Sequence, residues 1–245
     1  MSIDLNPREN LLAVGYRNGL VVLLDCTSLK SLSKISNHKN PDKEVLSLVK
    51  FSPSGELLAI AYCPPISKIY IYQTSNRKKI GECRGSPSRI TCIDFSMAGD
   101  FLIANNTSYE ILFYNAQNGN QVTRATQFQD EQWATMSCKF SWQCQGVWPH
   151  LYADGSNINV VERSHSKQLL ASGDDFSKIK LFRYPACQPK QFFNQFKGHS
   201  SHITGVKWSY DDRYLVSIGG LEKSVIQWKV IESKQDIIYE YEEEK

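Results

Sequence analysis

The chain has 245 residues, 41% hydrophobic and 22% charged, which is enough to bury a sizeable core in one large domain or two small ones. It contains no run of about 18 apolar residues, and its N-terminus, MSIDLNPRENLL, lacks the basic-then-apolar order of a secretory signal. A membrane-spanning or secreted protein is therefore not expected, and the seven scattered cysteines fit reduced thiols in the cytoplasm. The net charge is +3, but the last ten residues carry −4, which leaves +7 for the other 235 residues.

Five segments of the chain repeat one pattern. They begin at residues 2, 48, 92, 160 and 205, and the segment at 160 is the weakest match. Each consists of an alternating apolar strand, a polar turn and a second apolar strand that begins six residues after an anchor residue. The anchors are Leu5, Phe51, Phe95, Arg163 and Trp208.

The spacing of these anchors predicts the fold. The separations are 46, 44, 68 and 45 residues, and three of them match the period of about 40–45 residues of a propeller blade. A third strand follows in each repeat, in chain order GLVVLLD, KIYIY, EILFY, KIKLF and SVIQW. Alternating Val, Ile, Tyr and Phe indicate strands rather than helices. We therefore predict an all-β propeller of about five four-stranded blades.

The predicted domain covers residues 1–232 and is followed by an acidic tail at 233–245. The blades are placed near 1–37, 38–83, 84–126, 127–189 and 190–232. The separation of 68 equals one normal step plus about 23 residues, so the fourth blade contains an insertion.

The insertion includes DEQWATMSCKFSWQCQGVWPH at residues 130–150, with three of the five tryptophans of the chain. We expect Trp133, Trp142 and Trp148 to pack the insertion onto neighbouring blades, because buried indoles contribute a large apolar area. The alternative is an exposed aromatic surface for a partner, with Trp133 and Trp148 as anchors.

The last repeat, FKGHSSHITGVKWSYDDRYLVSIGGLEKSVIQW, resembles a WD repeat. In that pattern a His, an acidic turn residue, a Ser or Thr and a Trp form a buried hydrogen-bonded set. His199, Ser217 and Trp228 match it, the turn aspartate is missing, and Glu222 lies near its place. Tyr72, Tyr114 and Phe182 stand where the other repeats would have the Trp.

Three further stretches resemble a narrower family. GSPSRITCIDFSMAGDFLIANNTSYEILFYNAQNG, the insertion with QWATMSC and QGVWP, and LLASGDDFSKIKLFRYP look like the C-terminal propeller of the echinoderm microtubule-associated protein-like family. That family typically has W-x-T-W-T-C, G-I-W-P and G-D-D-F-G, so Met136, Val147 and Ser177 are departures. The resemblance covers residues 3 to 230 and implies tubulin or microtubule association and a role in cytoskeletal organisation.

The sequence gives little support for a catalytic, metal-binding or cofactor-binding site. Cys138, Cys144 and His150 are spaced C-x5-C-x5-H, outside the usual zinc spacing, and no P-loop or dinucleotide motif is present. Asp174 and Asp175 are better explained as turn stabilisers than as metal ligands. We expect no catalytic site, metal or cofactor.

The predicted function is a non-enzymatic protein-interaction module, cytoplasmic and associated with the cytoskeleton, with tubulin or microtubules as the suspected partner. The alternative is a generic WD-repeat scaffold for another protein complex. Surface candidates are Arg77, Lys78 and Lys79 in a basic hairpin. Nucleic acid is disfavoured because no regularly spaced stacking residues accompany the basic residues, and no membrane partner is expected.

Five blades predict an open arc. No residues precede Ile3 that could complete the last blade, so DIIYEYE at 236–242 either supplies that outer strand or is a frayed tail. An open ring exposes sheet edges and apolar blade faces. We therefore expect a fragment or short isoform that self-associates or depends on further blades.

Overall fold

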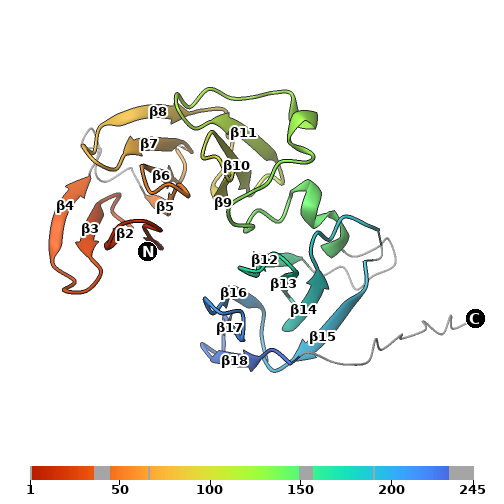
Figure 1. Ribbon diagram of the computed structural model, residues 1–245. Coiled ribbons are helices and arrows are strands. Elements are labelled where there is room, and N and C mark those ends of the chain that lie inside the picture. The colour runs from red at the N-terminus through yellow and green to blue at the C-terminus, as the bar shows by residue number, and fades with distance from the viewer. Residues whose placement is uncertain (1, 36–44, 66, 149–156, 190, 232–245) are drawn as a thin grey trace, which may run out of the picture.

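The computed structural model describes residues 2–35, 45–65, 67–148, 157–189 and 191–231. They form five small antiparallel sheets arranged as the blades of a propeller, as the repeat predicts (Figure 1). The predicted acidic tail and the strand expected at 236–242 lie outside the described residues. No helix in the described part of the chain is long and apolar enough to cross a membrane.

Each blade runs from an innermost strand near the propeller axis outwards. Blade 1 contains β1 (Ser2–Leu5), β2 (Leu11–Gly15), β3 (Val21–Asp25) and β4 (Ser31–Ile35). Blade 2 contains β5 (Leu46–Phe51), β6 (Leu57–Tyr62), β7 (Ile69–Gln73) and β8 (Lys79–Cys83). Blade 3 contains β9 (Ile90–Phe95), β10 (Phe101–Asn106) and β11 (Ile111–Asn115).

The last two blades follow the insertion, which contains the short 3-10 helices η1 (Ala125–Phe128) and η2 (Trp142–Val147). Blade 4 contains β12 (Ile158–Arg163), β13 (Leu169–Asp174), β14 (Lys178–Arg183) and β15 (Phe193–Lys197). Blade 5 contains β16 (Ile203–Trp208), β17 (Tyr214–Gly219) and β18 (Val225–Lys229).

Two of the five sheets have three strands rather than the predicted four in the described part of the chain. In blade 3 the chain beside the outer edge of β11 forms an isolated bridge between Tyr114 and Gln121, after which it enters the insertion. In blade 5 the described chain ends shortly after β18.

The core lies between successive blades, because both faces of each inner sheet are apolar. One cluster joins blades 1 and 2, a second joins blades 2 and 3, and another joins blades 4 and 5. The strands β1 and β5, β5 and β9, and β12 and β16 lie side by side around the axis.

Blades 3 and 4 are joined differently. The insertion stands between them and fills the space with its own cluster, which packs on Ile103 and Phe113 of blade 3 and on Val161 and Leu170 of blade 4. Figure 1 shows this segment, in green, between β11 and β14. The insertion therefore takes the place that direct blade contact has elsewhere in the arc.

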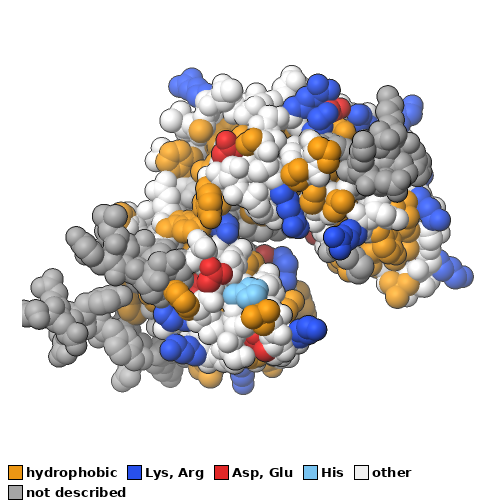
Figure 2. Space-filling model, turned by 180° about the vertical axis from the view of Figure 1, so that it is seen from behind, with side chains coloured by type: hydrophobic (Ala, Val, Ile, Leu, Met, Phe, Trp, Pro, Cys, Tyr) orange, Lys and Arg blue, Asp and Glu red, His pale blue; other side chains and the backbone are white. Residues whose placement is uncertain are grey.

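The arc is open between blades 1 and 5, as the five repeats predict (Figure 1). In the innermost strand of blade 1, Ile3 and Leu5 are 53% and 58% exposed. Val49 and Phe51, at the same repeat positions of blade 2, are only 3% and 4% exposed. From behind, the opening is a notch bordered by two lobes that carry exposed hydrophobic side chains (Figure 2). The faces that would meet a next blade are therefore uncovered.

Candidate protein-interaction site

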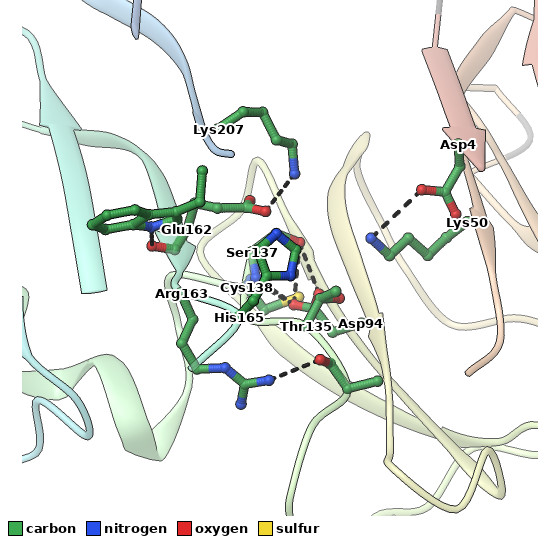
Figure 3. A network of polar contacts seen from close by, with 12 residues as sticks. Asp4, Lys50, Asp94, Thr135, Ser137, Cys138, Glu162, Arg163, His165 and Lys207 are labelled. Atoms are coloured by element: carbon green, nitrogen blue, oxygen red, sulfur yellow. Dashed lines mark hydrogen bonds and ion pairs between the residues drawn. The ribbon is translucent and has the colours of Figure 1, made fainter. Parts of the chain in front are cut away.

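A cluster of charged side chains lines the centre of the arc. Figure 3 shows Asp4, Lys50, Asp94, Glu162 and Lys207 around a common space, and each comes from the innermost strand of a different blade. Each directly precedes the anchor of its repeat. The apolar positions that predict the strands do not reveal these five charged positions, although the order Asp, Lys, Asp, Glu, Lys is visible in the aligned repeats.

These charges neutralise one another across neighbouring blades. Lys50 Nζ lies 3.8 Å from Asp4 Oδ1, and Lys207 Nζ lies 2.5 Å from Glu162 Oε1. Burial raises the pKa of Asp4 and of Glu162, and the paired lysines oppose that rise. Burial would lower the pKa of Lys50, but Asp4, Asp94 and Glu162 outweigh it and raise that pKa. The central cluster is thus an ion-paired lining that joins blades.

Asp94 instead binds the insertion. Its carboxylate is fully buried and accepts hydrogen bonds from the Thr135 hydroxyl, from the Ser137 N–H at 2.7 Å and from the Cys138 N–H at 2.8 Å. The Ser137 hydroxyl donates as well, at 3.1 Å. A carboxylate that receives several donors fixes the backbone that supplies them. Asp94 therefore anchors residues 135–138 beside the central cluster.

Arg163 makes a second attachment between the insertion and blade 4. It occupies the anchor position that is apolar in the other repeats, and its guanidinium donates to the carbonyls of Trp133 at 2.9 Å and Ala134 at 2.7 Å. The ring centre of Tyr184 lies 5.1 Å from the guanidinium carbon. An arginine among apolar anchors was the one sequence signal for this contact.

The tryptophans of the insertion lie in different environments. Trp133 is 1% exposed and packs against Phe113 and Phe128, with ring centres 6.1 Å away in both cases. This burial leaves no indole surface for a partner, so Trp133 does not fit the role of an exposed anchor. Trp148 is half-buried and stacks on Phe140 at 4.9 Å, at the edge of the insertion. Of the two candidates, Trp148 alone lies near the surface.

The WD-like residues of blade 5 come together in one hydrogen-bonded chain. His199 Nε2 lies 2.7 Å from Ser217 Oγ, which also accepts a hydrogen bond from Trp228 Nε1 at 2.7 Å. Glu222 Oε1 lies 2.7 Å from His199 Nδ1, so a glutamate occupies the place of the missing turn aspartate. The hydrogen bond from Ser201, followed by others including His199, lowers the pKa of Glu222 to about 2. This set ties the start of the blade to the turn between β17 and β18.

The basic hairpin between β7 and β8 is only partly free. Arg77 and Lys78 are exposed in the turn, whereas Lys79 pairs with Glu82 at 3.2 Å and lies over the ring of Tyr70. Burial would raise the pKa of Glu82, but hydrogen bonds from Lys68 and Lys79 outweigh it and lower the pKa to about 2. All three side chains are exposed, but of the three it is Lys79 that is held by Glu82.

The cysteines considered as zinc ligands are buried in the core, and Asp174 lies at a turn. Cys138 and Cys144 are fully buried, and burial raises the pKa of Cys144 to about 12. His150 lies outside the described residues, and among those that are described no group of three or more His, Cys, Asp and Glu side chains could hold a metal ion. Asp174 accepts hydrogen bonds from the N–H groups of Phe176 and Lys178, which fits the turn-stabilising interpretation.

Comparisons with known proteins agree with the fold and with the resemblance. The family model described as "Echinoderm microtubule-associated protein second beta-propeller" matches residues 1–230. The chain is 38% identical over 231 residues to "Echinoderm microtubule-associated protein-like 2" of Rattus norvegicus, covering 94% of this chain and 35% of that protein. It is 37% identical to the "77 kDa echinoderm microtubule-associated protein" of Lytechinus variegatus, covering 94% of this chain and 34% of that one. The chain thus spans about one third of the length of these relatives.

Among solved structures, the β-propeller domain of Myceliophteria thermophila Cps50 (Swd1) superposes with a TM-score of 0.58 at 13% identity. The match covers 98% of this chain and 68% of that one, and it supports the propeller fold alone. The family model and the relatives confirm the assignment that the inserted Trp–Cys segment and its flanking blades suggest. This chain belongs to the echinoderm microtubule-associated protein family and corresponds to its second β-propeller.

Proposed function

We propose that this chain is a non-enzymatic protein-interaction module that contacts tubulin and associates with the microtubule cytoskeleton in the cytoplasm. The observation that carries the proposal is family membership over 94% of the chain, with relatives whose names call them microtubule-associated. A propeller offers rigid strands with partner-facing turns at both ends, which suits binding rather than catalysis.

The charge of the molecule supports this partner. The body carries +7 outside its last ten residues, and such a charge attracts an acidic protein surface such as that of tubulin. Arg77 and Lys78 add exposed cations at the rim of blade 2. Contacts of this kind weaken as salt screens them over about 8–10 Å.

Sedimentation velocity of the chain with soluble tubulin, at low and at high salt, tests the proposal. We expect a complex that weakens with salt. Serum albumin, another acidic protein, is the matched control for attraction by charge alone and should form no complex. If the chain is indifferent to tubulin at both salt concentrations, the proposal is wrong, and the generic scaffold for another protein complex becomes the better account.

A further inference from the structure

Two cysteines from separate parts of the chain meet beside Asp94. Cys92 lies in β9, two residues before Asp94, and Cys138 lies in the insertion. The thiol of Cys138 donates a hydrogen bond to the sulfur of Cys92. The two side chains are therefore in direct contact, and both are free thiols.

Backbone contacts on both sides of Cys138 fix this meeting. The N–H of Cys138 donates to Asp94 at 2.8 Å, and Figure 3 shows the two residues side by side. Two residues later, the N–H of Phe140 donates to the side-chain oxygen of Asn105 at 2.9 Å. Asn105 pairs with Cys92 across β9 and β10, and the same side-chain oxygen lies 3.6 Å from Cys92 Sγ. The hydrogen bonds that attach the insertion to blade 3 therefore hold Cys138 against Cys92.

The sulfur of Cys92 lies among several donors. The hydrogen bond from Cys138, followed by those from the Thr91 hydroxyl at 3.6 Å and the Lys139 N–H, lowers the pKa of Cys92, although burial and the charge of Asp94 oppose this. The ammonium group of Lys139 also interacts favourably with a negative charge on Cys92. A thiol whose pKa is lowered provides more thiolate, which is the form that reacts with oxidants.

The two thiols differ in access and in acidity. Cys92 is half-buried and follows the exposed Thr91, whereas Cys138 is fully buried. Burial raises the pKa of Cys138 well above its ordinary value, and the hydrogen bond to Cys92 adds to this rise. A more accessible thiol of lowered pKa beside a thiol that stays protonated is the arrangement in which one cysteine reacts with an oxidant and the second resolves the product.

We propose that Cys92 and Cys138 form a modification site for hydrogen peroxide, in which Cys92 is oxidised first and Cys138 then closes a disulfide between β9 and the insertion. The Cys92 thiolate attacks one peroxide oxygen, the O–O bond breaks, and the leaving hydroxide takes up a proton to become water. The Cys138 sulfur then attacks the sulfur of the Cys92 sulfenic acid. Its proton leaves with the hydroxyl group as a second water, so two electrons pass from the two sulfurs to the peroxide.

A neighbouring pair of cysteines provides a comparison within the chain. The charge of Cys187 acts on Cys144, so these two residues are also close to each other. Burial raises the pKa of both thiols, that of Cys144 to about 12. Little thiolate forms at either residue at neutral pH, and we expect Cys92 to react at least about tenfold faster with peroxide than Cys187.

Peptide mapping by mass spectrometry tests the proposal. The folded chain is treated with hydrogen peroxide, the remaining thiols are blocked with N-ethylmaleimide, and the chain is digested with trypsin without reduction. Cleavage after Arg89, Arg124 and Lys139 yields peptides 90–124 and 125–139, which contain Cys92 and Cys138 as their single cysteines. We expect these two peptides joined, lighter by two hydrogen atoms than their sum, and separated again by dithiothreitol.

Variants separate the two roles. Cys92→Ser should abolish the joined peptide, and Cys138→Ser should leave Cys92 as a sulfenic acid that dimedone traps. Cys26→Ser replaces another half-buried cysteine, in blade 1, and is the matched control that should react like the wild type. Near-ultraviolet circular dichroism checks that each variant is folded.

The rates come from the unaltered chain, so the proposal is tested even where a variant does not fold. If Cys92 is consumed no faster than Cys187, or if its disulfide partner is not Cys138, the proposal is wrong. Oxidation of Cys92 to a sulfinic acid without any joined peptide would also contradict it, because Cys138 would then not resolve the sulfenic acid. No binding partner enters these measurements, so their result is independent of the proposed function.

Discussion

The attachment of the insertion to Asp94 can be tested by two substitutions that differ in what they remove. In Asp94→Asn the amide oxygen can still accept from the N–H groups of Ser137 and Cys138, and the amide NH2 can donate to the Thr135 hydroxyl. The partners are kept and the charge is lost. Hydrogen bonds to charged groups contribute about 1.5–3 kcal/mol and neutral ones about 0.5–1.5 kcal/mol. For two or three such bonds we expect a loss of about 2–3 kcal/mol in the free energy of unfolding.

Asp94→Leu removes the acceptor altogether. The donors of Cys138, which is buried, and of Thr135 and Ser137, which are half-buried, are then left without Asp94, and each such loss costs about 1–3 kcal/mol. We expect a total loss of about 4–6 kcal/mol, a large fraction of the about 5–15 kcal/mol by which domains are stable.

Urea unfolding followed by tryptophan fluorescence measures both values, with Asp100→Asn, an exposed aspartate in the turn after β9, as the control. A loss below about 1 kcal/mol for Asp94→Leu would refute the reasoning, because the insertion would then be held without these hydrogen bonds.

Three further expectations follow from single contacts. Arg163→Phe restores the residue type of the other anchors yet should destabilise the chain by about 2–4 kcal/mol in urea unfolding, because two buried carbonyls lose their donor. Glu82→Gln should lower the melting temperature at pH 7 but not near pH 2. A carboxylate whose folded pKa is lowered to about 2 stabilises the fold above its unfolded pKa of 4.5, and this stabilisation is lost as the pH falls towards 2. Leu5→Ser should change stability by less than about 0.5 kcal/mol and reduce concentration-dependent association in light scattering, because Leu5 is 58% exposed; the equivalent Phe51→Ser should destabilise strongly.

The arc of five blades was predictable from the sequence, because the strand pattern that encodes each blade is local and repeated. Alternation within each strand and a spacing of 44 to 46 residues between anchors are properties of short segments, and the core clusters lie where those strands meet. The WD-like set of His199, Ser217 and Trp228 was recognisable for the same reason. The number of strands per blade was less predictable, because an outer strand depends on where the chain goes next.

The role of the insertion could not be read in this way. Its residues follow no period, its 3-10 helices have only four and six residues, and its hydrogen bonds to Asp94 reach across 41 to 44 positions. Burial of Trp133 but not of Trp148 depends on which side of the segment faces blades 3 and 4.

The insertion also influences the width of the opening between blades 1 and 5. Blades 1–3 lie on one side of the insertion and blades 4–5 on the other, and both sides contact its packed side chains, through β10 and β11 of blade 3 and through β12 and β13 of blade 4. The opening lies on the far side of the axis from the insertion (Figure 1). A small change in the thickness of the insertion would therefore produce a larger change in the width of the gap between blades 1 and 5. Volume changes at Trp133 or Phe128 would therefore set how far blades 1 and 5 stand apart, without any change in the residues that border the gap.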